Sequence, residues 1–292
     1  MSSPHAAPTP PQPTADGAGP HGPALPAADR PTAGVAGHWL LARLGKRVLR
    51  PGGAALTTAL LDRAGLAGAD VVELAPGLGR TARDILDRRP RSYVGVDADP
   101  DAAAAVRRIV VDRGRTVVAD AAATTLPDTC ADVVIGEAML TMQGDRSKDA
   151  VIAEAARLLR PGGRYAIHEL ALGPGAVPEV VGTEVRQGLA RAIRVNSRPL
   201  PVDGWRALLE AHGLVVDHVD TAPMALLEPR RIVADEGLLG ALRFARNLLT
   251  QPDARHRVLA MRRTFRTNRA HLTAVAITAH RPEQLRSERG GV

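Results

Sequence analysis

Aromatic residues are scarce in this chain, with two Trp, two Tyr and two Phe among 292 residues. Proteins that bind single-stranded nucleic acid stack the bases on exposed aromatic rings, so this scarcity argues against that class. A single cysteine, Cys130, excludes an intramolecular disulfide framework and fits a reducing compartment. It also excludes a zinc cluster held by thiolates, and we predict no metal site.

Long apolar runs are missing as well. No stretch approaches the roughly 20 apolar residues that a membrane-spanning helix needs. The N-terminus has no basic segment followed by an apolar run, so it does not look like a secretory signal peptide. These absences lead us to expect a cytoplasmic protein.

Lysine is almost absent, because all of the 38 basic residues except Lys46 and Lys148 are arginine. Residues 228–292 hold 13 arginines and six acidic residues, an excess equal to the net charge of the whole chain, +7. Such a region can attract phosphate or an anionic surface. A solvated helical face is the simpler interpretation.

Composition divides the chain into four parts. Residues 1–32 are rich in Pro and Ala and have few large apolar side chains, which predicts a disordered tail. Residues 33–69 contain two amphipathic segments and are expected to form an N-terminal helical lid that includes His38 and Trp39. Residues 70–282 form the main domain, and residues 283–292 form a second flexible tail.

Within residues 70–282, short apolar runs alternate with helical patterns. Seven runs read as strands, near residues 71–74, 93–97, 116–120, 131–135, 164–168, 213–219 and 271–279. Runs that are apolar throughout indicate strands covered on both faces. The sequence therefore predicts an α/β fold, a doubly wound, Rossmann-like and mostly parallel seven-stranded sheet. Helical insertions at about residues 173–212 and 228–269 are expected to cap it.

Polar residues stand at the carboxyl ends of five predicted strands, where open α/β sheets bind their ligands. They are Glu73, Asp97, Asp120, Glu137 and the pair His168-Glu169. Several acids at one edge of the sheet suggest a cationic ligand.

The turn after the first strand has two interpretations. Gly77-x-Gly79-x-x-Ala82 matches the dinucleotide fingerprint, and Asp97 lies near the spacing of its ribose-binding acid. However, Glu73 would place a carboxylate beside the pyrophosphate, which is unfavourable. S-adenosylmethionine removes the conflict, because it carries a sulfonium and an ammonium and has no phosphate.

These residues resemble class I S-adenosylmethionine-dependent methyltransferases over about residues 70–170. Residues 73–79 resemble motif I, although Ala75 replaces its first glycine, and Asp97 resembles the ribose-binding acid. Asp120-Ala121 resembles the stretch that contacts adenine, and residues 158–163 resemble the turn before the fifth strand. The match is closest to the small-molecule branch, which includes ubiquinone/menaquinone C-methyltransferases. The resemblance implies these cofactor-binding residues: Glu73, Ala75, Gly77, Gly79, Asp97, Asp120, Ala121 and Glu137.

Methyl transfer is an in-line displacement that depends mainly on alignment and desolvation. A general base helps when the nucleophile is a hydroxyl or an acidic carbon, and His168 is the candidate. Its alternative is a histidine packed beneath the cap. The acceptor is expected to be a small organic molecule. An apolar acceptor is favoured because Met139, Met142 and Met224 lie in the predicted cap region.

Three other functions stay open at this point. The basic residues 243–269 could bind or modify RNA, the fold could serve as a non-catalytic ligand-binding module, or the protein could be an NAD-dependent oxidoreductase. The sequence does not identify the acceptor, the methylated atom, the pathway or the oligomeric state.

Overall fold

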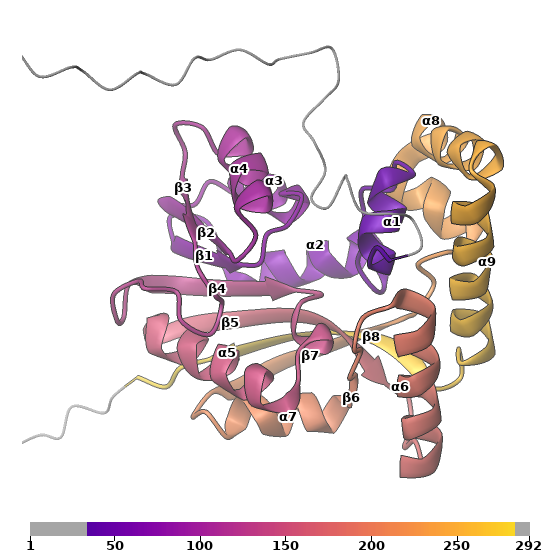
Figure 1. Cartoon of the computed structure of the whole chain (residues 1–292). Helices are drawn as coiled ribbons and strands as arrows, with labels where there is room; N and C mark the ends of the chain where they lie inside the picture. Colours follow the sequence, from indigo (N-terminus) through magenta and orange to yellow (C-terminus); the bar gives the residue numbers. More distant parts are fainter. Residues whose placement is uncertain (1–33, 284–292) are drawn as a thin grey trace, which may run out of the picture.

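The computed structural model describes residues 34–283, and the tails predicted at residues 1–32 and 283–292 lie outside them except for residue 283. Over the described residues the chain alternates strands and helices around one sheet (Figure 1). From residue 70 the main strands and helices are, in order, β1 (Asp70–Leu74), α3 (Arg80–Leu86), β2 (Ser92–Asp97), α4 (Pro100–Ile109), β3 (Arg115–Val118), β4 (Ala131–Glu137), α5 (Asp145–Leu158) and β5 (Leu159–Leu172). The turn predicted at residues 160–163 lies inside β5.

The strand order is β3-β2-β1-β4-β5-β8-β7, with β7 spanning Val215–Pro223 and β8 spanning Leu272–His280. The pairs among β1 to β5 are parallel, whereas β8 runs antiparallel to both β5 and β7. This confirms the predicted Rossmann-like seven-stranded sheet. A short additional strand, β6 (Leu200–Pro201), pairs with the end of β5 and was not predicted.

The sheet is buried on both faces, as the continuous apolar runs predicted. Along β1 and β4, Val72 and Val134 face one core cluster while Val71 and Val133 face the other. The first cluster is completed by α5 and α7 (Val202–Glu210), and the second by α2 (Gly53–Ala64), α3 and α4.

Two helices therefore lie elsewhere than expected. α2 was expected in the lid, but Leu56, Leu60 and Leu61 bury it against the sheet beside β5 and β8. α7 was expected in the cap, but its fully buried Trp205 packs in the first cluster and donates through Nε1 to the Leu170 carbonyl oxygen at 3.2 Å. Each helix has one strongly apolar face, and that face pairs with the sheet.

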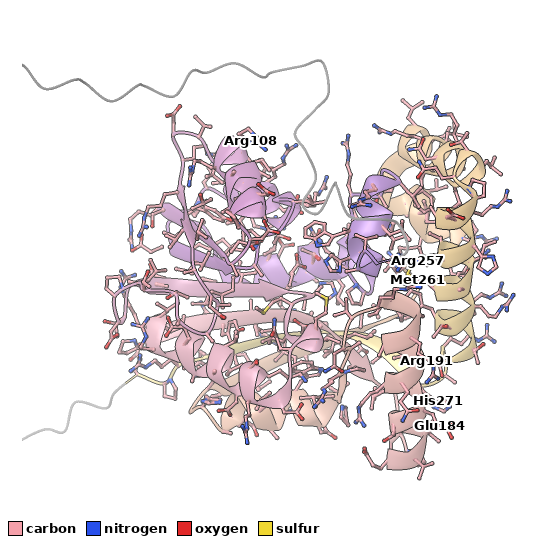
Figure 2. All side chains as sticks on the ribbon, viewed as in Figure 1. Arg108, Glu184, Arg191, Arg257, Met261 and His271 are labelled. Atoms are coloured by element: carbon pink, nitrogen blue, oxygen red, sulfur yellow. The ribbon has the colours of Figure 1, made fainter. Side chains whose placement is uncertain are left out.

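The cap consists of α1 (Gly37–Arg43), α6 (Glu179–Ile193), α8 (Pro229–Thr250) and α9 (Pro252–Thr267), which share a third core cluster. α1 and α9 meet closely, because a Cβ built on Gly37 would lie 3.0 Å from Met261 Sδ. Figure 2 shows Met261 on the side of α9 that faces α1 and the top of α6. The cap thus closes over the carboxyl ends of the parallel strands.

Within the described residues no helix is long and apolar enough to span a bilayer.

Candidate functional site

Glu73, at the end of β1, is buried with 2% of its surface exposed. Its Oε2 accepts a hydrogen bond from the Tyr93 hydroxyl at 2.5 Å. Desolvation raises the pKa of Glu73 to about 8, although the Tyr93 hydrogen bond and nearby Arg50 oppose the rise. In the free protein at neutral pH Glu73 is therefore mostly protonated, and a further cation beside it would favour release of that proton.

The loop after β1 turns tightly through left-handed backbone conformations. Ala75, Gly77 and Gly79 have φ values of 52°, 55° and 69°. A Cβ on Gly77 would meet nothing nearer than the Ala75 carbonyl oxygen at 4.0 Å, so this glycine borders open space. A Cβ on Gly79 would lie 2.4 Å from Ile109 Cδ1, the end of a flexible side chain of α4, and its φ of 69° is the stronger reason for glycine at this position.

Asp97, at the end of β2, joins the second strand to this loop. Its Oδ2 accepts a hydrogen bond from the Gly77 backbone N–H at 3.0 Å, and its Oδ1 accepts one from the Asp99 N–H at 3.0 Å. Burial raises the pKa of Asp97, and these two backbone hydrogen bonds oppose the rise. A carboxylate has about four acceptor sites, so capacity for two further hydrogen bonds remains.

A cavity of about 310 Å³ lies at the carboxyl ends of β1, β2 and β4. One side of it is formed by the strand ends and the glycine loop. Its lining there comprises Glu73, Ala75, Pro76, Gly77, Leu78, Arg80, Thr81, Asp97, Glu137 and Ala138. The structure thus brings Glu73, Ala75, Gly77, Asp97 and Glu137, five of the predicted cofactor residues, around one space.

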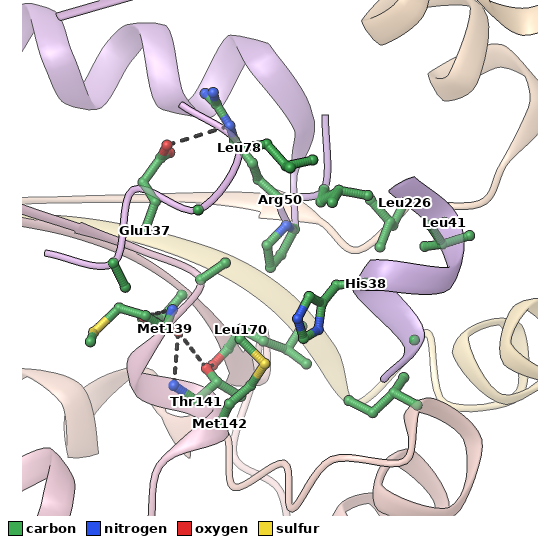
Figure 3. A pocket seen from close by; sticks show the side chains of 18 of the residues that line it. His38, Leu41, Arg50, Leu78, Glu137, Met139, Thr141, Met142, Leu170 and Leu226 are labelled. Atoms are coloured by element: carbon green, nitrogen blue, oxygen red, sulfur yellow. Dashed lines mark hydrogen bonds and ion pairs between the residues drawn. The ribbon is translucent and has the colours of Figure 1, made fainter. Parts of the chain in front are cut away.

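The other side of the cavity, which we call the apolar chamber, is mostly hydrophobic and is closed by the cap (Figure 3). Its residues come from α1, α6 and α9, from the last part of β5 and from the segments after β4, α6 and β7. They are Gly37, His38, Trp39, Leu41, Met139, Thr141, Met142, Glu169, Leu170, Leu189, Ile193, Ser197, Met224, Leu226, Met261 and Phe265. The three methionines predicted near the acceptor are all among them. The segment between α1 and α2 completes the lining of the cavity with Arg47, Leu49, Arg50 and Pro51.

Glu137 is held by a buried polar network. Its carboxylate lies 3.4 Å from Arg50 Nε and 2.8 Å from His168 Nδ1, and Thr57 and Thr81 donate hydrogen bonds to it. Burial opposes its ionisation, but Arg50 and His168 outweigh burial and hold the pKa of Glu137 at about 2. Glu137 is thus an ionised group whose oxygens are already occupied by the protein.

His168 is fully buried and does not line the cavity. Its Nε2 lies 2.6 Å from the Pro51 carbonyl oxygen, and its Nδ1 faces Glu137. With both ring nitrogens engaged, the imidazole cannot reach a bound acceptor. The expectation of a catalytic base at His168 is corrected to the packed histidine that was its alternative.

Asp120, Ala121 and Gly79 also lie outside the lining of the cavity. Asp120 is exposed, and its Oδ1 accepts a hydrogen bond from the Ala122 N–H at 2.8 Å, which closes its own turn. Because these three residues do not border the cavity, its lining gives no support for their predicted contact with a cofactor.

Glu169 takes a role that the sequence pattern did not reveal. It is fully buried, and its carboxylate accepts hydrogen bonds from the backbone N–H groups of Met139, Leu140 and Thr141 and from the Thr141 hydroxyl. Burial raises its pKa and these hydrogen bonds oppose the rise. Glu169 fixes the segment after β4, including the short helix η1 (Leu140–Met142), as one wall of the apolar chamber.

Residues 71–163 match the family model described as a methyltransferase domain. An uncharacterized protein of Haemophilus influenzae is 33% identical over 256 residues, which cover 84% of this chain and 98% of that protein. The chain contains a class I S-adenosylmethionine-dependent methyltransferase domain. The match to the methyltransferase model rules against the alternative that the protein is an NAD-dependent oxidoreductase.

Solved structures share the fold of this methyltransferase. A protein titled a sarcosine dimethylglycine methyltransferase from Galdieria sulphuraria superposes with a TM-score of 0.62 at 16% identity, covering 79% of this chain and 86% of its own. A geranyl diphosphate methyltransferase in complex with S-adenosylmethionine superposes with a TM-score of 0.55 at 19% identity, covering 78% and 84%. At these identities the likeness concerns the fold.

The cofactor of the methyltransferase is S-adenosylmethionine, and the residues at the cavity fit it. The open space beside Gly77 allows the backbone to approach a ligand closely, and Asp97 offers free acceptor sites. The buried Glu73 beside the loop supplies a negative charge once a cation arrives.

Proposed function

We propose that this methyltransferase transfers a methyl group to a small, uncharged and largely apolar organic acceptor by in-line displacement. The observation that carries the proposal is the single cavity in which the glycine loop and Asp97 face an apolar chamber. S-adenosylmethionine, when bound, supplies an electrophilic methyl group. The chain's contribution is to align the two reactants and to exclude water.

Each residue of the loop side has a proposed task. Glu73 would balance the positive charge of the cofactor, and Asp97 would accept hydrogen bonds from the two ribose hydroxyls. Gly77 would allow the close backbone approach, while Ala75 and Gly79 would set the shape of the loop. Glu137 would act as a positioning residue, because its network joins Arg50 and α2 to the end of β4.

The acceptor class follows from the apolar chamber. Methionine, leucine and phenylalanine side chains dominate its walls, and its one carboxylate, Glu169, is occupied by hydrogen bonds from the protein. Away from Arg47, Arg50 and Arg80, which also line the cavity, a charged acceptor would lose its hydration without a partner. The resemblance to ubiquinone/menaquinone C-methyltransferases supports the same class, acceptors with an apolar body.

Mass spectrometry of the purified protein tests the cofactor, because co-purified S-adenosylhomocysteine or S-adenosylmethionine would be released on denaturation. Transfer of a labelled methyl group from S-adenosylmethionine to a panel of neutral apolar alcohols, phenols and ketones tests the acceptor. Binding of such acceptors should change little between 50 and 200 mM salt. Methylation of RNA with strong salt dependence would contradict the proposal and favour the basic C-terminal helices as the binding surface.

A further inference from the structure

Ser197 places a hydroxyl without a partner in the wall of the apolar chamber. Its side chain is buried, with 2% exposure, and among the described residues no atom hydrogen-bonds its Oγ. The segment that carries it follows α6 and is fixed by a hydrogen bond from the Arg198 N–H to the Thr141 carbonyl oxygen at 2.7 Å. The hydroxyl is therefore held in place by its backbone.

His38 brings a second polar group to the same chamber from α1. Within residues 34–283 neither nitrogen of its ring has a hydrogen-bond partner, and the ring stacks at a tilt on Trp39 with 4.7 Å between centroids. Figure 3 shows the imidazole on the side of the cavity occupied by Leu170 and Met142. Burial lowers the pKa of His38 to about 4, so at neutral pH the ring carries one N–H donor and one acceptor nitrogen.

Ser197 and His38 both line the chamber, and the packing of the cap places α1, which carries His38, beside the end of α6, which leads to Ser197. A Cβ on Gly37 would lie 3.2 Å from the Cα of Ile193, so α1 meets the end of α6 next to His38. Ser197 lies four residues beyond Ile193. Thr141 and Glu169 on this wall satisfy each other, because the Thr141 hydroxyl donates to Glu169 at 2.6 Å.

Buried polar groups without partners cost free energy, which a ligand of matching chemistry recovers. We propose that Ser197 and His38 form the polar anchor of the acceptor site and that the acceptor carries a hydroxyl on an otherwise apolar body. A hydroxyl both donates and accepts, as do a serine hydroxyl and a neutral imidazole. This inference rests on the proposed function and narrows its acceptor class to alcohols, phenols and enols.

A matched pair of probes, 1-naphthol and naphthalene, isolates the hydroxyl. Their binding is measured by calorimetry or NMR titration on protein saturated with S-adenosylhomocysteine. Wild type should bind 1-naphthol about fivefold more tightly than naphthalene, the gain expected of one net hydrogen bond. Ser197→Ala and His38→Phe should each reduce this preference to twofold or less and leave the affinity for naphthalene unchanged.

Thr278→Val is the control, because the Thr278 hydroxyl is also buried without a partner but lies on β8 outside this cavity. It should keep the fivefold preference. Melting temperatures report folding, and Ser197→Ala should melt no lower than wild type because it removes an unsatisfied buried hydroxyl. If His38→Phe fails to fold, Ser197→Ala alone decides the test.

Equal binding of the two probes by wild type would overturn the inference, as would an unchanged preference in Ser197→Ala. Failure of the proposed function has a different signature, which is no binding of S-adenosylhomocysteine or S-adenosylmethionine by wild type. In that case the preference for 1-naphthol is still measured on the free protein. The polar anchor and the methyltransferase activity are therefore judged by separate readouts.

Discussion

Glu137 Oε1, at the end of β4, lies 2.8 Å from Nδ1 of His168, its partner in register on β5. The sequence pattern suggested separate tasks for these two residues, contact with the cofactor and general base. In the structure they satisfy each other. Because His168 Nε2 also reaches the Pro51 carbonyl oxygen, the pair ties the segment between α1 and α2 to the sheet.

We expect His168→Ala to lower the free energy of unfolding by about 3 kcal/mol, because it leaves the ionised Glu137 with one partner fewer in a buried site. Affinity of the folded variant for S-adenosylmethionine should stay within about twofold of wild type. Urea denaturation and calorimetry measure the two effects.

The surface pair of His212 and Asp149, 2.9 Å apart, provides the control for this experiment. Asp149 is 61% exposed there, so His212→Ala should cost less than about 1 kcal/mol. Full stability of His168→Ala together with lost turnover would restore His168 as the base.

Asp97→Ala is expected to weaken S-adenosylmethionine binding by at least about 1 kcal/mol, the scale of a lost charge-assisted hydrogen bond. Asp99→Ala is the matched control, because Asp99 caps α4 through hydrogen bonds from the Asp101 and Ala102 N–H groups and does not line the cavity. It should lower stability by about 1 kcal/mol without a comparable loss of affinity. Equal losses of affinity in both variants would remove Asp97 from the site.

The strands were predictable because burial on both faces leaves a continuous apolar pattern, as at residues 71–74 and 131–135. The edge that holds the site was predictable too, since parallel strands direct Glu73 and Asp97 to one edge of the sheet. The layer that each helix joins was not predictable. An apolar face such as that of Trp205 and Leu209 on α7 indicates that the helix is buried. It does not indicate which part of the protein covers that face.

Contacts between residues that are distant in the sequence were not predictable either. Arg50 and Glu137 meet from segments far apart in the chain, and no local spacing encodes that contact. Asp120 carried the same signal as Asp97, an acid after a strand, yet its carboxylate closes its own turn. Ser197 gave no signal at all, because a single serine after a helix is common and only the burial of its hydroxyl sets it apart.

Ala75→Gly should raise the free energy of unfolding by about 0.5–1 kcal/mol. Ala75 has a φ of 52°, a left-handed conformation that costs alanine more than glycine, and the relief exceeds the entropy that glycine adds to the unfolded chain. Ala82→Gly, inside α3, should have the opposite effect and cost about 1 kcal/mol. Urea denaturation compares the two, and a loss of stability in Ala75→Gly would contradict the left-handed turn.

The pH dependence of stability should reveal Glu73. Its pKa is raised from 4.5 to about 8 in the folded protein, so the folded state holds a proton that the unfolded state has released between these values. The contribution of protonated Glu73 to the free energy of unfolding is therefore complete below about pH 4.5, and it is lost as the pH rises toward 8. Relative to Glu73→Gln, wild type should lose up to about 1.4 kcal/mol per pH unit in this window.

Binding of the cationic cofactor should reverse that protonation, because a positive charge beside Glu73 lowers its pKa. At pH 7, wild type should then release more protons on binding S-adenosylmethionine than Glu73→Gln does, by close to one proton per molecule. Calorimetry in buffers with different ionisation enthalpies measures the number, and subtracting the variant removes the cofactor's own titration. Equal proton release by the two proteins would mean that Glu73 does not face the positive charge of the cofactor.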